Sequence, residues 1–362
     1  MRTTTHDDDR PVPSAPEVLG RDRRRARPRR RRPGLRLLAL LVAVLVALGT
    51  AVAAGAALWV ENVARAWDSR VEVLEQPFRP EAERPAEAEP GAVDVLLIGS
   101  DSRGPGGELD VEAAGATGAR SDTLVLVHVS PDRRDVEVTS LMRDLWVPIP
   151  GHGEAKLNAA LSWGGVPLTV ATVEDLLGVR IDHVAAIDFE GFRAVTDVLG
   201  GVDVDVETPF ELDGHVYPAG TAHLRGDDAL TFVRARYPFA DGDYTRVRNQ
   251  QAFLVGVARQ LVSHETLRDP ARLTAFVEAV APWVSVDSGL DLPTLVELGW
   301  SLRSVPLDHV VTGTVPTAGT ATIGDQSVVL PDRAGLDAWR QHLVADGAEG
   351  AGAADAAAPT GP

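Results

Sequence analysis

The sequence predicts an α/β protein: a single exported domain with a central mixed β-sheet flanked by helices on both faces, preceded by one N-terminal transmembrane helix. Between residues 92 and 346, apolar β-rich runs alternate with helical patterns, and such interleaving implies a sheet covered on both faces. Two of the runs, VLLIG and LVLVHV, are apolar enough for central strands. The uncharged apolar run at residues 37–60 can cross a bilayer, because it spans roughly 36 Å as a helix.

Charge is divided unevenly along the chain. The 362 residues carry a formal net charge of −17, yet residues 1–36 hold twelve Arg against five Asp and Glu, a balance of +7 that leaves −24 for the rest. Ten of these arginines directly precede the apolar run, which predicts a cytoplasmic N-terminus, a single pass through the cell membrane and an extracytoplasmic domain. The alternatives are a cleaved signal peptide, for which the run is too long, and nucleic-acid binding, a less common use of such arginines. Nucleic acid is therefore not an expected partner.

Composition also divides the chain into segments. The absence of Cys excludes disulfides, zinc–thiolate sites and cysteine nucleophiles. Trp59 and Trp67 are candidates for the outer membrane interface. We expect a disordered Arg-rich cytoplasmic tail at 1–33, the transmembrane helix at 37–60, an extracytoplasmic Pro/Glu/Ala linker at 61–91, the folded domain at 92–346, and a disordered tail at 347–362.

The elements of the folded domain follow from periodicity and turn signals. Strand patterns cover residues 93–98, 123–129, 135–142, 183–188, 202–206 and 309–313, with hairpins at 211–224 and 322–330. Helical patterns cover residues 157–163, 167–177, 189–199, 227–233, 244–263, 271–281, 292–303 and 334–343.

The stretch VRARYPFADGDYTRVRNQQ, residues 233–251, concentrates four arginines, two aspartates and a Gln pair ahead of an apolar helical run. If the chain is extended at Arg234 and Arg236, their guanidinium groups point the same way, roughly 7 Å apart. Arginine forks bind phosphate oxygens bidentately, so this pair indicates an anionic ligand.

The helix that follows carries the same signal. Asp243 occupies its N-cap position, and Arg246 and Gln250 lie i,i+4 at the start of a stripe that is otherwise apolar. Polar side chains at the start of a core-facing stripe indicate that an anionic group binds there. A surface ion-pair cluster is the alternative, because Arg is abundant in this chain.

Two aspartates stand at predicted strand ends, where α/β sheets gather their ligands. Asp101 follows the strand at 93–98, and Asp122 precedes the strand at 123–129. Two carboxylates on neighbouring loops can hold Mg²⁺ together with substrate phosphates. Taken singly, Asp101 is better explained as an Asx-turn residue and Asp122 as a strand-edge cap. Walker and Gly-x-Ser-x-Gly loops are absent, which argues against a P-loop enzyme and a serine hydrolase.

Lys156 is the only lysine, beside 34 arginines, so either a specific role or chance retention explains it. His152 has no metal-ligand partner at a suitable spacing and is interpreted as structural.

Seven blocks together resemble the LytR–CpsA–Psr family of cell-wall glycopolymer transferases. In chain order they are DVLLIGSDSR, RSDTLVLVHVSPDRRDVEVTSLMRD, IPGHGEAKLNAA, IDHVAAIDFEGF, VLGGVDVDV, LRGDDALTFVRAR and GDYTRVRNQQ. The resemblance covers about residues 92–263, and the order of tail, span and exported domain is also that of the family.

The resemblance implies transfer of a glycan phosphate from a polyprenyl-pyrophosphate carrier to a peptidoglycan hydroxyl, with Mg²⁺ or Mn²⁺ as cofactor. By position, it assigns the metal to Asp101 and Asp122. It assigns the diphosphate and its polar rim to Arg143, Arg234, Arg236, Asp243, Arg246 and Gln250, and further substrate contacts to Arg120, Lys156 and Asn158.

The chain departs from the family pattern at three places. Met142 replaces the usual Pro, Tyr237 replaces the usual His, and residues 104–119 lengthen the loop between the two aspartates. Two alternative functions remain: a polyprenyl-pyrophosphate hydrolase that uses the same site, and a non-enzymatic membrane regulator. The Arg-rich tail shows neither a helix-turn-helix nor a heptad that a regulator would use.

Overall fold

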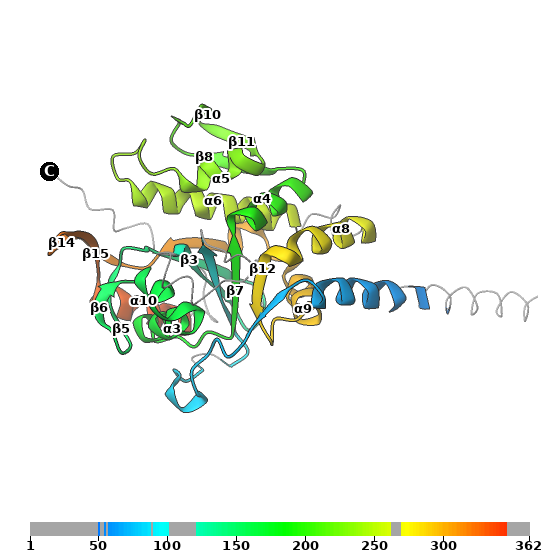
Figure 1. The fold of residues 1–362 in the computed structure, drawn as a ribbon, viewed down its shortest axis with the longest axis horizontal. Coiled ribbons are helices and arrows are strands. Elements are labelled where there is room, and N and C mark those ends of the chain that lie inside the picture. The colour runs from blue at the N-terminus through cyan, green and yellow to red at the C-terminus, as the bar shows by residue number, and fades with distance from the viewer. Residues whose placement is uncertain are drawn as a thin grey trace, which may run out of the picture. The chain divides into compact units, whose positions relative to one another are not determined.

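The structure is a computed structural model that describes residues 50, 54–55, 57–87, 90–100, 121–261 and 269–345. It contains two compact units, residues 1–57 and 58–362. In the first unit, the few described residues are helical. Most of the predicted span at 37–60 lies outside the described residues; within the described part of the chain, no helix has both the length and the apolarity to cross a membrane. The second unit contains the sheet and is shown in Figure 1.

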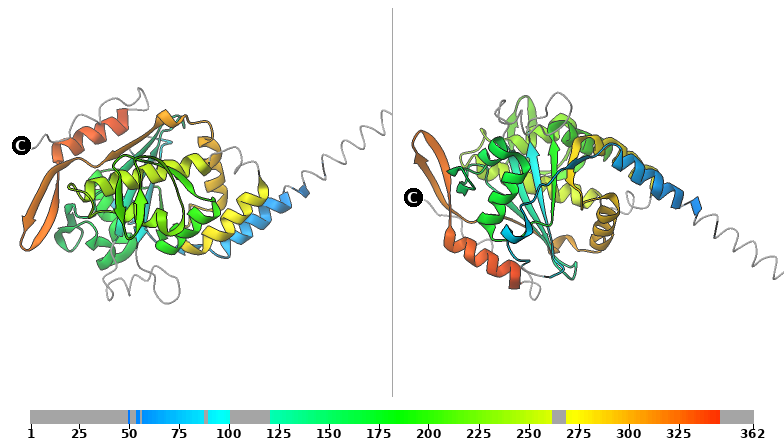
Figure 2. Two further views of the ribbon diagram at one scale, coloured as in Figure 1. Left: turned by 90° about the horizontal axis from the view of Figure 1, so that it is seen from above. Right: turned by 60° about the horizontal axis from the view of Figure 1, so that its bottom comes forward.

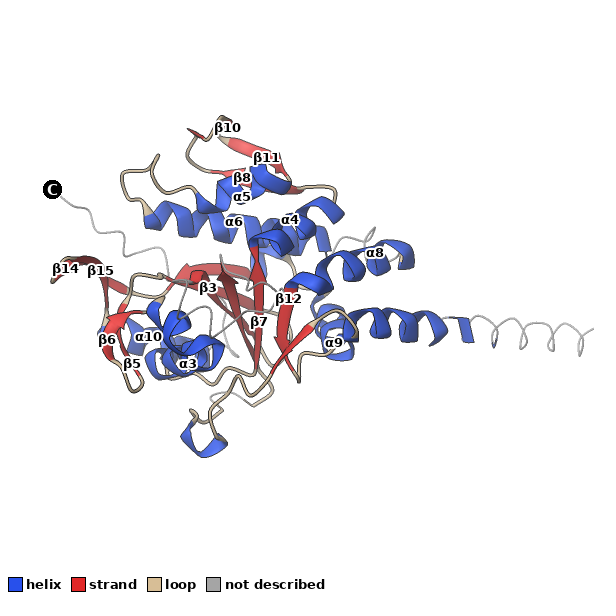
Figure 3. Ribbon diagram, viewed as in Figure 1, coloured by secondary structure: helices blue, strands red, loops and turns tan. Residues whose placement is uncertain are grey.

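A seven-stranded mixed sheet forms the centre of this unit, which confirms the predicted fold class (Figures 1 and 3). Its order is β1 (Glu72–Leu74), β12 (Val284–Asp287), β7 (His183–Asp188), β2 (Val93–Ser100), β3 (Ser121–Val129), β4 (Val136–Leu141) and β13 (Val310–Thr314). Three neighbouring pairs are parallel (β1–β12, β7–β2, β4–β13), and three are antiparallel (β12–β7, β2–β3, β3–β4).

The register of the strands brings several strand ends to one edge of the sheet. Ser100, the last residue of β2, pairs with Ser121 at the start of β3 and with Asp188 at the end of β7. The end of β4 lies beside the start of β3, and β13 runs parallel to β4. The loop after β4 therefore begins at the same edge as the β2–β3 connection.

Helices pack against both faces of the sheet. Because side chains alternate along a strand, Leu96, Ile98 and Leu124 share one face, where they form a core with α3 (Ala159–Leu177). Ser140 lies on the opposite face, where its Oγ accepts a hydrogen bond of 3.1 Å from Nε2 of Gln251 on α6 (Asp243–Leu261).

A second hydrophobic core joins α6 to two neighbouring helices and to two small two-stranded sheets. It contains α4 (Phe189–Val198), α5 (Gly226–Arg234), the pair β8 (Val202–Val206) and β11 (Gly220–Leu224), and the pair β9 (Phe210–Leu212) and β10 (His215–Tyr217). The hairpin predicted at 211–224 is thus two structures. Asp213 and Gly214, both at positive φ, turn β9 into β10, while β11 returns to β8.

The C-terminal part adds α8 (Pro270–Val280), α9 (Leu292–Leu302), the hairpin β14 (Thr317–Ile323) and β15 (Gln326–Pro331), and α10 (Arg333–Ala345). The hairpin lies at the margin of the domain in each view of Figure 2. The hairpin β5 (Trp146–Ile149) and β6 (Gly153–Lys156) precedes α3. The sequence patterns missed β1, β12, β5 and β6, because strands of three or four residues are too short for alternation to show.

The range predicted as a linker, 61–91, is partly built into the domain, and this differs from the expectation. Val63 and Trp67, on the helix at residues 57–68, are buried against α8, against β12 and against residues that come directly after these two elements. Trp67 is therefore not at a membrane interface. β1 extends the central sheet through its parallel pairing with β12. Local composition indicated a spacer, but these few apolar and strand residues find partners more than 200 residues away.

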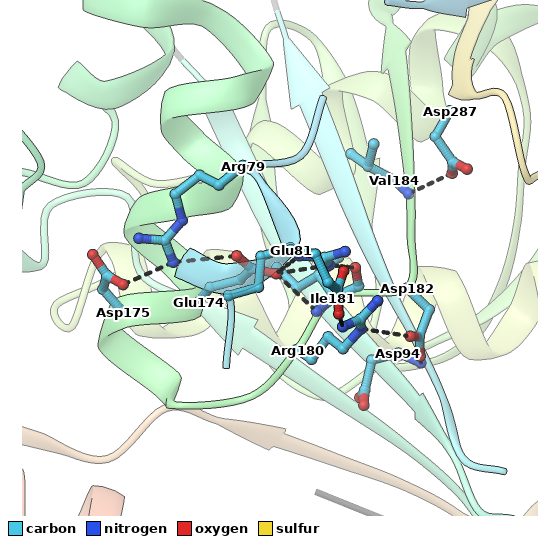
Figure 4. A network of polar contacts seen from close by, with 11 residues as sticks. Arg79, Glu81, Asp94, Glu174, Asp175, Arg180, Ile181, Asp182, Val184 and Asp287 are labelled. Atoms are coloured by element: carbon cyan, nitrogen blue, oxygen red, sulfur yellow. Dashed lines mark hydrogen bonds and ion pairs between the residues drawn. The ribbon is translucent and has the colours of Figure 1, made fainter. Parts of the chain in front are cut away.

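The rest of that range is held by a buried carboxylate. Glu174 of α3 has no exposed surface and accepts hydrogen bonds of 3.0 and 2.8 Å from Arg84, one of 3.3 Å from Arg79 and one of 3.2 Å from the backbone N–H of Ile181. Figure 4 shows this network. We call residues 79–84, which include the short helix η1 (Glu81–Glu83), the strap.

Candidate active site

Four separate segments bring charged side chains together near the sheet edge. The loop after β4 supplies Arg143 and Asp144, and the end of β6 supplies Lys156. The chain after α5 supplies Arg236, and the first turn of α6 supplies Asp243 and Arg246. The loop and the hairpin are tied by backbone hydrogen bonds, 2.8 Å from Leu157 to Leu145 and 3.0 Å from Asn158 to Arg143. We call Arg143, Asp144, Lys156, Arg236, Asp243 and Arg246 the cation cluster.

Two carboxylates organise the cation cluster. Nζ of Lys156 lies 3.1 Å from Oδ1 of Asp144, and Nε of Arg143 lies 3.8 Å from its Oδ2. Nε of Arg236 lies 2.7 Å from Oδ1 of Asp243, and Nη2 of Arg246 lies 3.3 Å from its Oδ2. Four cations therefore face two carboxylates, and the formal excess of two positive charges suits an anionic ligand.

Burial strengthens the electrostatic interactions among these charges. Arg246 is 5% exposed, and the side chains of Asp144 and Asp243 are 13% and 11% exposed. Burial raises the pKa of Asp144 and is the largest single effect on it. The hydrogen bond and charge of Lys156, the charge of Arg143 and the adjacent side chain of Asp243 together outweigh burial, so the pKa of Asp144 lies below its ordinary value and the group is ionised at neutral pH.

The ion pair between Arg236 and Asp243 is short but poorly aligned. Its Oδ1 is buried and, among the described residues, receives no aligned hydrogen bond, although Arg236 approaches it. Because α6 begins at Asp243 itself, the carboxylate lies in the first helical turn rather than at the predicted N-cap.

Two other predicted residues lie differently. Arg234 ends α5, so the chain is not extended there; its side chain is exposed and its Cζ lies 4.4 Å from the centre of the Phe189 ring. Gln250 is buried and donates 3.1 Å to the carbonyl of Val233. A carbonyl at the end of α5 thus accounts for the Gln250 amide, and no anion is needed to explain its burial.

The remaining predicted residues fall into two groups. Asn158 is buried as the N-cap residue of α3, and its side chain makes no cap hydrogen bond. Asp101, Arg120 and the loop 104–119 lie outside the described residues, while Asp122 is the second residue of β3. Across the described part of the chain, no group of three or more His, Cys, Asp or Glu residues could hold a metal ion.

The sequence analysis did not assign a role to Asp144, although Asp144 directly follows the candidate residue Arg143 and this Arg-Asp pair was a usable signal. Asp144 is the residue through which Lys156, Arg143 and Asp243 meet. By contrast, Arg248 turns to the opposite side of α6. It pairs with Asp241 at 2.8 Å and Glu207 at 3.3 Å, and it lines a pocket with Asp203 and Arg259 that is separate from the cation cluster.

The fold and the cluster together define an α/β protein with a cation-rich cluster of side chains at one edge of its sheet. The LytR_cpsA_psr family model matches residues 63–343, and the chain belongs to this family. The match includes residues 63–91, in agreement with their packing into the domain.

Relatives and solved structures agree with this assignment. A polyisoprenyl-teichoic acid–peptidoglycan teichoic acid transferase TagU of Bacillus anthracis is 33% identical over 235 residues, 63% of this chain and 73% of its own. The crystal structure of B. subtilis TagV matches with a TM-score of 0.59 and 26% identity, over 70% of this chain and 95% of TagV. A structure of TagT bound to LI-WTA matches with a TM-score of 0.57 and 25% identity, over 73% of this chain and 96% of TagT.

Proposed function

We propose that this protein is a phosphotransferase that moves a glycan phosphate from a polyprenyl-pyrophosphate carrier to a hydroxyl of peptidoglycan. The relatives' names support a polyisoprenyl-linked donor and a peptidoglycan acceptor, because TagU is named for both. The product is a phosphodiester between glycan and peptidoglycan, and the leaving group is the polyprenyl phosphate.

The observation that carries this proposal is the cation cluster. Phosphoryl transfer depends mainly on positioning and on stabilising charge as it develops, so it requires cations in a partly dry site. Arg143, Lys156, Arg236 and Arg246 provide such cations, and Arg246 is 5% exposed. We assign these residues to the diphosphate oxygens.

In the proposed reaction, the acceptor oxygen attacks the phosphorus that carries the glycan. The bond from this phosphorus to the bridging oxygen breaks, and the electron pair leaves with the polyprenyl phosphate. We assign the hydroxyl proton to the carboxylate of Asp243, whose Oδ1 makes no aligned hydrogen bond among the described residues although Nε of Arg236 lies 2.7 Å away. Arg236 and Arg246 hold that carboxylate in place.

The residues expected to bind a metal fit Mg²⁺ or Mn²⁺ by their chemistry. Both Asp101 and Asp122 offer carboxylate oxygens, the ligands that hard cations prefer. Ser100, the residue before Asp101 in the sequence, pairs with Ser121, the residue before Asp122. A metal bound there would neutralise charge on the diphosphate.

We also propose the topology of a single-pass membrane protein. The apolar run at 37–60 crosses the cell membrane, the Arg-rich N-terminus remains in the cytoplasm, and the domain acts outside the cell. This placement brings the domain to the surface that displays a membrane-anchored donor.

Arginine variants test the phosphate assignment. Arg246→Lys and Arg236→Lys should each lower turnover of a short-chain lipid-diphosphate donor by roughly 10²–10³-fold, because lysine keeps the charge but loses the bidentate fork. Arg248→Lys is the matched control on the same helix, and its turnover should stay within about twofold of wild type because exposed ion pairs contribute little. Melting temperatures identify variants that fail to fold, and Arg236, at 40% side-chain exposure, is the less disruptive of the two sites.

The same assay separates transfer from hydrolysis. Donor consumption that requires peptidoglycan supports the transferase, whereas an equal rate without acceptor would support the hydrolase. Equal mild losses in all three arginine variants would contradict the phosphate assignment.

A further inference from the structure

Outside the cation cluster, two aromatic rings stack on the surface between the β5–β6 hairpin and the first turn of α3. Trp163 is 48% exposed, unusual for a residue of its size. The His152 ring lies against it, with centroids 5.2 Å apart and an interplanar angle of 30°. We call Trp163 and His152 the aromatic platform.

Both rings are fixed by the backbone beside them. Immediately after Trp163, Gly164 and Gly165 leave helical geometry, and Gly165 has a φ of 62°. A Cβ at Gly164 would lie 2.6 Å from Cβ of Leu168, so this break depends on glycine. His152 lies between Gly151 and Gly153, both at positive φ, and its N–H bonds the carbonyl of Ile149 at 2.9 Å. The backbone that carries the two rings therefore has a defined conformation at both residues.

The aromatic platform is continuous with the cation cluster through short pieces of chain. His152 precedes Lys156 by four residues of nearly extended chain, roughly 13 Å. Trp163 follows Asn158 by five residues of helix, roughly 7.5 Å. Asn158 is bonded to the backbone of Arg143. Since these connections are regular structure, the distance from platform to cluster is fixed, and a short run of linked sugars can span it.

We propose that the aromatic platform binds a pyranose ring of the donor glycan, some way along the chain from the diphosphate. An exposed aromatic face carries partial negative charge and attracts the weakly positive C–H face of a sugar, while the imidazole can hydrogen-bond a hydroxyl. The donor is favoured over the acceptor because its sugars are covalently fixed to the group that the cation cluster holds. This inference rests on the proposed function and adds a subsite for the glycan.

A series of donors tests the subsite. The full-length protein is assayed with short-chain polyprenyl diphosphates that carry no sugar, or one, two or three N-acetylhexosamine rings. For Trp163→Ala, the KM should equal that of wild type for the sugar-free compound and rise about threefold to tenfold once the glycan is long enough to reach the platform. Trp163→Phe should restore most of the wild-type KM, because it keeps an aromatic face.

Trp300→Ala is the matched control, since Trp300 of α9 is 62% exposed and its ring is also covered on one side by a neighbouring side chain, Arg303. It should leave every KM unchanged. The donor assignment is overturned if Trp163→Ala matches this control, if its penalty is the same for all donors, or if only the KM for peptidoglycan rises. Failure of the wild-type protein to consume any donor would instead overturn the proposed function itself.

Discussion

At the residue scale, Asp144 links parts of the site that are far apart in sequence. It lies one residue from Arg143, 12 residues from Lys156 and 99 residues from Asp243, and it interacts with all three. Lysine side chains have considerable rotamer freedom, so a half-buried carboxylate is an effective way to hold the ammonium group in one place. We infer that Asp144 is a positioning residue for Lys156.

A double-mutant cycle tests this role. Asp144→Asn and Lys156→Met should each lower the unfolding free energy by roughly 1–3 kcal/mol, because each leaves a half-buried charge without its partner. The double variant should lose less than the sum, with a coupling of at least about 0.5 kcal/mol. The exposed pair Asp241–Arg248 provides the reference and should show a coupling within about 0–0.5 kcal/mol. Equal coupling in the two cycles would contradict the inference.

The pH dependence of the same pair has a definite sign. The folded pKa of Asp144 is below its ordinary value, so the carboxylate contributes stability above the unfolded pKa and loses it as pH falls through the folded pKa. The stability difference between wild type and Asp144→Asn should thus be constant near neutral pH. It should shrink only in acid, below the ordinary pKa of an aspartate, when urea unfolding is followed as a function of pH.

At the element scale, the strap is the segment whose structure departs most from its composition. Pro, Glu and Ala dominate residues 76–91, yet Arg79 and Arg84 reach α3 and close around Glu174. The Arg84 side chain is 6% exposed and also stacks on Phe78, with Cζ 4.5 Å from the ring centre. The strap therefore fixes the start of the folded domain against its core.

Removing the central carboxylate should release the strap. Glu174→Ala should lower the unfolding free energy by about 3–5 kcal/mol, because it leaves Arg84 buried and uncompensated. A glutamate-specific endoprotease should then cut after Glu81 and Glu83 in the folded protein faster than in wild type. Asp175→Asn is the neighbouring control; it removes only an exposed partner of Arg79 and should cost about 0–1 kcal/mol. A small loss for Glu174→Ala with unchanged cleavage would show that the strap is held by other contacts.

At the scale of the whole molecule, the charge distribution supports the proposed single-pass topology. The Arg-rich residues 1–36 carry +7 and the rest of the chain −24, with an uncharged run between them. Such a division is typical of a chain threaded once through a membrane with its basic end inside.

Protease accessibility tests this topology. Protease added to intact spheroplasts should remove the domain after residue 60 and leave an epitope tag in residues 1–33 protected. Permeabilised spheroplasts, in which both sides are digested, are the control. Protection of the large domain in intact spheroplasts would contradict the proposed orientation. Deleting residues 1–33 while preserving insertion should leave transfer intact, and its loss would favour the regulator.

The sequence by itself determined the α/β class, most of the helices, the longer strands and the family. These features depend on local periodicity, turn residues and continuous motifs, which can be read over ten to twenty residues. β7, β8 and α4 begin at the predicted residues and end within one residue of the prediction. The sequence also singled out Arg236, Asp243 and Arg246, because they fall within one stretch.

Only the tertiary structure decided which of these side chains meet. Asp144 and Lys156 pair because β5 and β6 fold back on each other, and Arg234 leaves the cluster because α5 ends at that residue. Gln250 donates a hydrogen bond to a carbonyl at the end of α5. The segment predicted as a linker joins the sheet by pairing with β12, more than 200 residues away. Such contacts depend on long-range packing and on the burial of charge, and neither can be predicted from a local pattern of residues.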